Sequence, residues 1–416
     1  MNYGLILEGG GAKGSYQIGA VKALKEMGIK FSGVAGTSIG ALNGAMIIQE
    51  DFDKAYDLWY NISPKKIFNI EQDALDKIKK LSFDKKDLSY LWSQVKSVVD
   101  NKGLDVSMIE DIVEKNVDEH RIRSSRKDFG IVTISLSDMK PIKIYIEEIP
   151  EGKLNDYLLA SSNLPTFKQE KRNGKYFLDG GFYDNMPIDM LVDKGYKDII
   201  VIRTHGLGVT RDIEETKDLN IIYIEPKEDL GNLLDFDNKI ARRNLKLGYY
   251  DAKKVFQEDI KGHDYYIRTD KEKDYFIKLL LNIPENSVKK IAKFMGFGEM
   301  NYRRALFEVV IPRLAKFLDL DEKDDYQDIT LCILELIAKR ANIDKFKIYD
   351  FDNFVKLISK KYEPIEVNEI NVPTFVKKSE ILSKTIKDNI IDLVIAELFD
   401  NIINRNGEYE LWKIIW

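Results

Sequence analysis

Short apolar runs alternate with helix-like runs through the first part of the chain. The apolar runs, of which 129–135 and 142–146 are rich in β-branched residues, predict strands at 3–7, 31–35, 129–135, 142–146, 176–178, 198–203 and 221–224. After the first of these, apolar residues recur at helical spacing, as in Ile18, Val21 and Leu24. Alternating strands and helices are typical of a mainly parallel sheet with helices on both faces. The pattern therefore predicts a three-layer α/β/α fold.

Two longer stretches have a purely helical pattern. Residues 51–128 mix helical spacing with many polar and aromatic side chains, which predicts a helical insertion over the sheet with a break at 101–103. Such an insertion can serve as a lid. Residues 271–416 again space their apolar side chains as helices do, so we expect a packed helical domain after a boundary near Asp270. Nothing in this second stretch indicates chemistry.

Composition and charge narrow the class of protein. The chain has 416 residues, of which 44% are hydrophobic and 32% charged, which is typical of a soluble globular protein. The formal net charge of -5 leaves no overall basic field for nucleic-acid binding. Basic runs at 77–86 and 121–127 suit either an anionic membrane surface or, more simply, solvated helix faces. We expect Cys332, the single cysteine, to be a buried apolar residue.

The sequence shows neither the pattern of a signal peptide nor that of a membrane-spanning helix. The chain enters an apolar strand-like segment at 3–7 without a preceding basic region, and no run approaches the roughly 18 apolar residues of a spanning helix. We therefore expect a cytoplasmic protein, with peripheral contact to membranes as a further hypothesis.

The segment Gly36-Thr37-Ser38-Ile39-Gly40 stands between a predicted strand and a helix-like run at 41–48. A Gly-x-Ser-x-Gly sequence at such a junction is the pattern of a nucleophile elbow, which holds a serine hydroxyl above the edge of a sheet. We expect the glycines to permit unusual dihedral angles and a close passage of the helix over the strand. The simpler alternative is a turn of small residues with an incidental serine.

A second glycine cluster follows the first predicted strand. Gly9, Gly11 and Gly14 lie between that strand and a helix, whose N-terminus leaves backbone N–H groups unpaired. A phosphate-binding P-loop would require lysine after Gly14, where Ser15 stands. A dinucleotide site fits the glycine spacing but requires an acid at the end of the second strand, where Ser38 stands. A loop whose backbone N–H groups bind an oxyanion beside Ser38 requires neither a lysine after Gly14 nor an acid at the end of the second strand.

A serine nucleophile also needs a base to take its proton. Asp179 ends a predicted strand and is followed by Gly180 and Gly181, a bend that other backbone can approach closely. In isolation this Asp-Gly pair is also a common turn. His205 follows another strand, and the chain order Ser38, Asp179, His205 is that of an α/β-hydrolase triad. The residues alone do not decide whether Asp179 or His205 is the base.

Together these motifs resemble those of the patatin-like phospholipases. That family carries G-G-G-x-[K/R]-G after the first strand, G-x-S-x-G after the second, and D-G-[A/G] far downstream. Residues 9–14, 36–40 and 179–181 match these patterns in the same order. The resemblance extends from 3 to about 266, so it implies a patatin-like catalytic domain at 1–270.

The resemblance implies a lipid acyl hydrolase of the phospholipase A or lysophospholipase type. Ser38 would attack the ester carbonyl and form an acyl-enzyme, with Asp179 as general base and then acid. Backbone N–H groups of Gly9, Gly10 and Gly11 would bind the oxyanion. A carboxylate has an ordinary pKa near 4, so we expect partial burial to raise the pKa of Asp179.

The remaining motif residues are expected to support this site. We expect Lys13 near a headgroup phosphate and Asp184, with Asn185, supporting the bend after Asp179. The supporting glycines are Gly14, Gly36, Gly40, Gly180 and Gly181.

The partners follow from the same resemblance. We expect a phospholipid or other lipid ester as substrate, no cofactor, no metal and no nucleic acid. A homodimer through the amphipathic C-terminal helices is a further hypothesis. Two alternatives stay open: an esterase or thioesterase with a triad that includes His205, and a catalytically silent module that binds a lipid or nucleotide.

Overall fold

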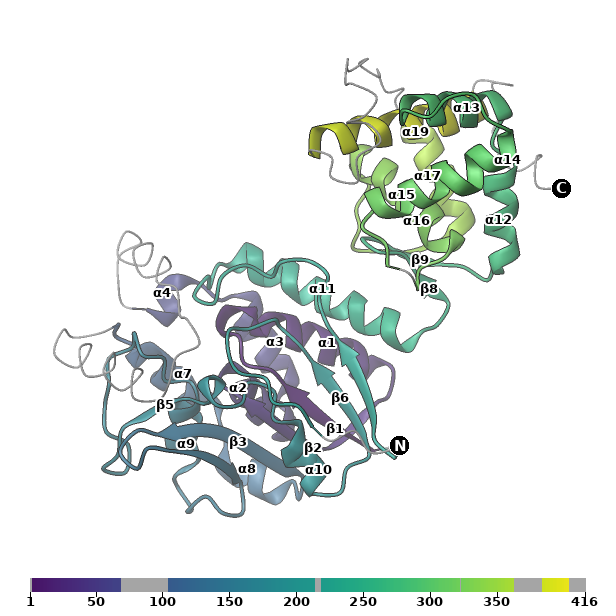
Figure 1. The fold of residues 1–416 in the computed structure, drawn as a ribbon. Helices are drawn as coiled ribbons and strands as arrows, with labels where there is room; N and C mark the ends of the chain where they lie inside the picture. The colour runs from purple at the N-terminus through teal and green to yellow at the C-terminus, as the bar shows by residue number, and fades with distance from the viewer. Residues whose placement is uncertain (1, 69–103, 214–217, 322, 363–383, 404–416) are drawn as a thin grey trace. The chain divides into compact units, whose positions relative to one another are not determined.

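The chain divides into two compact units, which we name the sheet unit (Met1–Phe256) and the helical unit (Gln257–Trp416). A computed structural model describes residues 2–68, 104–213, 218–321, 323–362 and 384–403. In Figure 1 the sheet unit runs from purple to teal, and the helical unit is mostly green and yellow.

The sheet unit is built on one seven-stranded sheet. Its strands are β1 (Asn2–Leu7), β2 (Lys30–Thr37), β3 (Asp128–Ser135), β4 (Lys140–Tyr145), β5 (Phe177–Asp179), β6 (Asp198–Ile202) and β7 (Asn220–Ile224). Their order is β4-β3-β2-β1-β6-β7, and β5 also pairs with β3. All neighbours are parallel except β4 and β5, which run antiparallel to β3. The predicted mainly parallel sheet is therefore confirmed.

Helices cover both faces of this sheet, as the alternation of side chains along each strand requires (Figure 1). On one face Ile6 of β1 belongs to a buried core that includes residues of α10 (Ile188–Asp193). On the other face the next residue, Leu7, lies against α2 (Ile39–Ile48), where a Cβ on Gly44 would come within 3.8 Å of its Cδ1. The three-layer α/β/α arrangement follows from these two cores.

Helix α1 (Gly14–Glu26) packs backbone to backbone against α11 (Asn238–Phe256). A Cβ on Gly19 would lie 2.0 Å from the carbonyl oxygen of Leu245, so only glycine permits this approach. The close helix pair holds α1 in place, and the N-terminus of α1 adjoins the glycine cluster.

The described residues of the predicted insertion at 51–128 form mainly helices, joined by short loops. Its helices are α3 (Phe52–Tyr60), α4 (Pro64–Ile67), α7 (Ser107–Asn116) and α8 (Glu119–Ser124). The expected break at 101–103 and the basic run at 77–86 lie outside the described residues.

The second basic run, 121–127, is paired with acidic side chains. The Arg123 guanidinium lies 2.6 Å from the Glu119 carboxylate, and Lys127 Nζ lies 2.7 Å from Glu50 Oε1. These ion pairs neutralise much of the local charge, which favours the interpretation of a solvated helix face over that of a membrane-binding patch.

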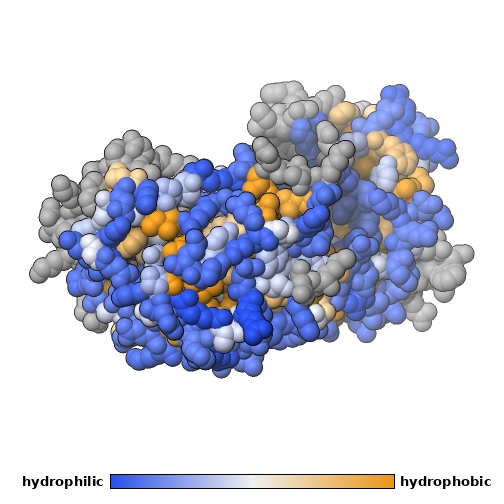
Figure 2. All heavy atoms as spheres, turned by 90° about the horizontal axis from the view of Figure 1, so that it is seen from below, coloured by the Kyte–Doolittle hydropathy of each residue, from blue (hydrophilic) through white to orange (hydrophobic). Residues whose placement is uncertain are grey.

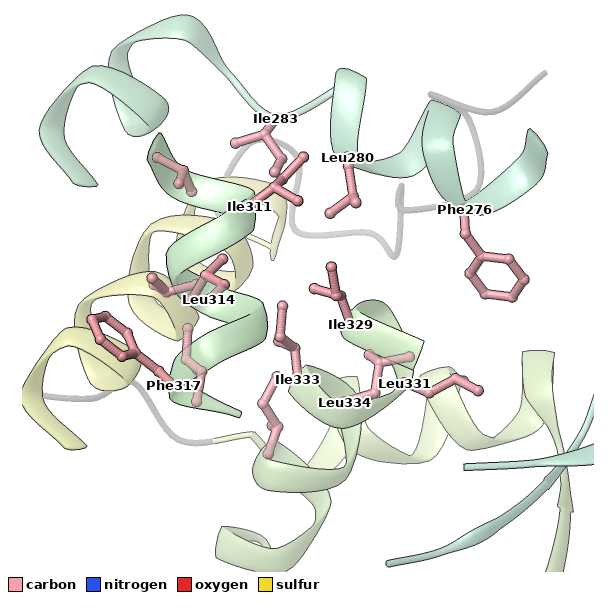
Figure 3. Packing of buried hydrophobic residues seen from close by; sticks show 14 of the residues in the cluster. Phe276, Leu280, Ile283, Ile311, Leu314, Phe317, Ile329, Leu331, Ile333 and Leu334 are labelled. Atoms are coloured by element: carbon pink, nitrogen blue, oxygen red, sulfur yellow. The ribbon is translucent and has the colours of Figure 1, made fainter. Parts of the chain in front are cut away.

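The helical unit encloses its own apolar core. Its helices are α12 (Lys273–Leu281), α13 (Glu285–Phe294), α14 (Tyr302–Arg304), the π-helix η3 (Ala305–Val310), α15 (Ile311–Phe317), α16 (Tyr326–Arg340), α17 (Phe351–Lys361) and α19 (Lys384–Ile403). Figure 3 shows side chains from three of them converging, among them Leu280 of α12, Leu314 of α15 and Ile333 of α16. Burial of such side chains contributes roughly 1.5–3 kcal/mol each to folding before entropy is counted.

The boundary between the units falls at Phe256, earlier than the expected position near Asp270. The helical unit contains a three-stranded sheet in the order β10-β9-β8. Its strands are β8 (Ile260–Lys261), β9 (Tyr266–Arg268) and β10 (Ile348–Asp350). Because β9 pairs with β10, the segment before Asp270 belongs to the helical unit and not to the edge of the main sheet.

The expected burial of Cys332 is confirmed. In the described parts of the chain, no helix is both long enough and apolar enough to cross a membrane. Figure 2 shows one face of the molecule, where hydrophilic side chains dominate and hydrophobic ones gather in separate patches.

Candidate active site

Ser38 stands at the junction between β2 and α2 in a backbone conformation that L-residues rarely adopt, with φ 56° and ψ −128°. A Cβ on Gly36 would lie 2.5 Å from the backbone of Gly40, and a Cβ on Gly40 would lie 2.1 Å from the carbonyl oxygen of Leu7. The glycines therefore permit the close passage of the helix, as expected. The unusual dihedral angles, however, fall on Ser38 itself and not on the glycines.

Ser38 and Asp179 meet although 141 positions separate them. The Ser38 hydroxyl donates a hydrogen bond of 2.5 Å to Asp179 Oδ2. The other carboxylate oxygen, Oδ1, accepts the backbone N–H of Gly181 at 2.8 Å. Ser38 is 9% exposed and Asp179 is 4% exposed, so the pair lies where water competes little.

Burial raises the pKa of Asp179 to about 6, although the hydrogen bonds from Ser38 and Gly181 act in the opposite direction. The expected direction of the shift is therefore found. With such a pKa the carboxylate is mostly ionised at neutral pH, yet it is a stronger base than an exposed aspartate.

The bend after Asp179 depends on its two glycines. A Cβ on Gly180 would lie 2.2 Å from the carbonyl oxygen of Val132 in β3. A Cβ on Gly181 would lie 2.8 Å from Asn185 Oδ1. Gly180 therefore lets the bend pack onto the sheet, and Gly181 leaves room for the Asn185 side chain.

The glycine loop is held by side chains from two later segments. The Gly9 carbonyl accepts Thr204 Oγ1–H at 2.8 Å and the Asn185 side-chain amide at 3.2 Å. The Gly9 N–H donates to the Asn185 carbonyl at 3.1 Å, so it is not free to bind an oxyanion. The N–H groups of Gly10 and Gly11 donate to no acceptor among the residues that the structure describes.

This loop lies beside Ser38. A Cβ on Gly9 would be 3.3 Å from the Cβ of Ser38. Gly11 has a φ of 54°, and a Cβ there would lie 2.2 Å from the carbonyl oxygen of Leu233. At the start of the following helix, a Cβ on Gly14 would lie 2.6 Å from Ile39 Cγ1. The glycines thus bring unpaired backbone donors close to the serine.

His205 does not reach the serine with its imidazole. Its ring is half exposed, and Nε2 lies 4.0 Å from Glu225 Oε2. Its backbone N–H donates to Glu8 Oε2 at 3.0 Å, and its carbonyl accepts Lys13 Nζ at 3.1 Å. Since the Ser38 hydroxyl donates directly to Asp179, the geometry argues against a triad through His205.

Asp184 is a buried partner of Lys143. Its Oδ2 lies 2.6 Å from Lys143 Nζ, and its Oδ1 accepts the N–H of Met186 at 3.2 Å. Burial raises the pKa of Asp184, and the hydrogen bond from Lys143 opposes that rise. These contacts suit the expected structural role better than a catalytic one.

Ser38 forms part of the wall of a pocket of about 500 Å³. The helical insertion supplies much of the lining through α3, α4 and α7. The apolar lining residues are Ile39, Leu42, Met46, Ala55, Leu58, Trp59, Ile62, Ile67, Met108, Ile109, Ile112, Val113, Val117, Leu164, Phe167, Leu234 and Phe236. A pocket of this kind suits an apolar chain attached to a group that reacts at Ser38.

One polar residue of this pocket, Asn43, was missed by sequence reasoning. Asn43 is buried in the wall and donates to the Gly14 carbonyl at 3.0 Å and to Gln17 Oε1 at 2.8 Å. Its own carbonyl oxygen accepts Trp59 Nε1–H at 2.9 Å. This network links the insertion to the helix after the glycine loop, and no sequence motif marks it.

Three side chains that could ligate a metal lie close together in the helical unit: His263, Asp324 and Asp328, with ligand atoms within 4.8 Å of one another. Asp324 and Asp328 each accept a nearby backbone N–H, from Asp321 and Asp325. Carboxylates that stabilise turns and helix starts in this way are common without any metal.

The part of the chain that holds Ser38 and Asp179 is similar to known proteins. Residues 5–192 match the family model described as patatin-like phospholipase. The neuropathy target esterase sws of Drosophila melanogaster is 28% identical over 202 residues, which are 48% of this chain and 12% of that protein. Patatin-like phospholipase domain-containing protein 7 of Rattus norvegicus is also 28% identical over 202 residues, 48% of this chain and 13% of the relative. This chain thus matches about an eighth of each relative.

Among solved structures, VipD from Legionella pneumophila is similar with a TM-score of 0.39 and 14% sequence identity. The similarity covers 98% of this chain and 93% of that chain.

Proposed function

We propose that the protein is a lipid acyl hydrolase of the phospholipase A or lysophospholipase type, on the premise that residues 5–192 match the family model described as patatin-like phospholipase. The observation that carries the proposal is the 2.5 Å hydrogen bond from the Ser38 hydroxyl to the buried carboxylate of Asp179. The apolar pocket beside Ser38 supports an acyl ester as the substrate.

In the proposed reaction Asp179 Oδ2 takes the proton of the Ser38 hydroxyl as Oγ attacks the ester carbonyl. The tetrahedral intermediate collapses when the bond to the alcohol breaks, and Asp179 returns the proton to the leaving oxygen. Water then attacks the acyl-Ser38 ester and gives its proton to Asp179. This releases the fatty acid and restores the hydroxyl.

Gly10 and Gly11 are the proposed oxyanion donors. Their N–H groups lie in the loop beside Ser38 and have no acceptor among the described residues. Loss of one such donor typically lowers kcat by about 100- to 1,000-fold. Gly9, which we expected as a third donor, is left out because its N–H is bound to Asn185.

Other expectations stay predictions. These are a headgroup contact by Lys13, peripheral contact with membranes, a cytoplasmic location and a homodimer, which light scattering at micromolar concentration tests. Lys13 Nζ donates to the His205 carbonyl, so a headgroup would have to compete with that bond.

Fatty-acid release from mixed phospholipid micelles tests the proposal. We expect the wild type and His205→Ala to be active, and Ser38→Ala and Asp179→Asn to be inactive while folded. Inactive but folded His205→Ala would instead favour the triad esterase. If the wild type releases nothing from lipids or short esters, labelling of Ser38 by a fluorophosphonate probe separates an enzyme that needs an activator from a silent binding module.

A further inference from the structure

The segment at the end of α9 (Leu154–Ser161) touches the backbone of both members of the proposed dyad. Ser161 Oγ accepts the backbone N–H of Ser38 at 2.8 Å. Two residues later, the carbonyl of Asn163 accepts the backbone N–H of Asp179 at 2.8 Å. One short segment therefore connects the nucleophile to its base.

Ser161 is itself held firmly. Its side chain is fully buried, and its hydroxyl donates to the carbonyl of Val132 at 2.6 Å. Val132 lies in β3 opposite Thr37, the last residue of β2. Because the hydroxyl proton is committed to Val132, an oxygen lone pair is left to accept the N–H of Ser38.

The contact matters because Ser38 has a strained backbone. After Ser38 the chain is held by α2, since the Ser38 carbonyl accepts the N–H groups of Ala41 at 2.9 Å and Leu42 at 3.3 Å. On the N-terminal side, the N–H of Ser38 itself donates to the Ser161 hydroxyl. A residue in a sparsely populated conformation keeps it only when its surroundings hold both sides. Without the Ser161 oxygen, a buried N–H would lack a partner.

We propose that Ser161 is a positioning residue, which holds the Ser38 backbone so that its hydroxyl points at Asp179. The proposal rests on the proposed function. It also assigns the N–H of Ser38 to Ser161, so that this N–H does not bind the oxyanion and Gly10 and Gly11 do.

The test compares Ser161→Ala with a matched loss of a buried serine hydroxyl, Ser135→Ala. Ser135 is fully buried as the last residue of β3, and its hydroxyl donates to Asp138 Oδ2 at 2.7 Å, so it contacts neither Ser38 nor Asp179 through this hydrogen bond. For Ser161→Ala we expect kcat to fall by about 10- to 100-fold with KM changed by less than about threefold, because a small misplacement of a reacting group is costly. Ser135→Ala should keep kcat within about twofold.

A second measurement separates positioning from general loss of stability. If the Ser38 hydroxyl moves away from Asp179, the carboxylate loses a hydrogen bond that lowers its pKa, so the acid limb of kcat/KM should move to higher pH in Ser161→Ala. If the substitution only lowered the stability of the fold, the pH of the acid limb of kcat/KM would not change. Ser161→Thr, which keeps the oxygen, should recover rate and pH profile. Ser161→Cys, with a weaker acceptor, should lie between alanine and wild type.

All rates are referred to the folded fraction from thermal unfolding, and fluorophosphonate labelling of Ser38 is followed in parallel. Unchanged kcat and unchanged pH limb in folded Ser161→Ala would overturn the proposal. If the alanine variant does not fold, the same result for Ser161→Cys overturns it. A wild type that neither releases fatty acid nor labels at Ser38 would sink the proposed function instead, so the two failures are distinguishable.

Discussion

The sheet unit and the helical unit each contain a deeply buried carboxylate whose pKa burial raises, to about 6 for Asp179 and to about 7 for Glu335. They differ in their hydrogen-bond partners. Glu335 accepts three backbone N–H groups, from His263 at 2.8 Å, Asp264 at 2.9 Å and Tyr265 at 3.2 Å. Asp179 accepts one backbone N–H and keeps its other oxygen for the hydroxyl of Ser38.

A raised pKa at a carboxylate therefore marks desolvation and does not by itself mark catalysis. Glu335 supports the turn between β8 and β9, and both of its oxygens are used by that turn. Asp179 is also supported, but one oxygen faces a nucleophile in the wall of a pocket. Both carboxylates are buried, so what distinguishes the proposed base from the structural carboxylate is the group that its second oxygen contacts.

The largest expected effect is on activity. Ser38→Ala and Asp179→Asn should each lower kcat by at least about 1,000-fold, because the nucleophile and its base act as a unit. Glu335→Gln, a matched loss of charge at a buried carboxylate, should keep kcat within about threefold. The measurement is fatty-acid release by folded variants. A folded Glu335→Gln variant without activity would show that Glu335 also serves the reaction.

The second effect is on stability. Glu335→Ala leaves the N–H groups of the turn at 263–265 without their acceptor, and we expect the free energy of unfolding of the helical unit to fall by about 1–3 kcal/mol. Urea unfolding followed by hydrogen exchange at residues of that unit measures this loss. An unchanged midpoint would mean that water or other backbone replaces the carboxylate.

The third effect is the pH dependence of activity. Asp179 must be ionised to act as a base, and its pKa is raised to about 6. Below that pH we expect kcat/KM to fall by about tenfold for each pH unit, with a plateau above it. A profile that stays flat down to pH 4.5 would show that Asp179 is not the titrating base.

The smallest effect is the pH dependence of stability in the helical unit. The folded pKa of Glu335 lies above its ordinary value of 4.5, so between about pH 4.5 and 7 the folded state binds more protons than the unfolded state. The stabilising contribution of protonated Glu335 is thus complete below 4.5 and is lost as pH rises through about 7. The unfolding temperature of Glu335→Gln should depend less on pH in that window than that of the wild type.

Much of the fold could be predicted from local patterns. The strands and the helical insertion appear near their predicted positions, because apolar periodicity reports which face of an element is buried. The division into compact units at Phe256 is not visible in the local pattern. It depends on the pairing of β9 with β10, and nothing local to β9 shows which distant strand it joins.

The candidate site, like the fold, could be predicted from the sequence only in part. The elbow around Ser38, the glycine loop and the double-glycine bend after Asp179 can be recognised in the sequence alone, because close backbone approach excludes every residue with a Cβ. The groups that meet across the sheet are known only from the folded chain: the Ser38 hydroxyl with Asp179, the Gly9 N–H with Asn185, and the His205 ring with Glu225. Such pairings depend on which distant backbone passes within hydrogen-bond reach, and on which donors the folded chain has already used.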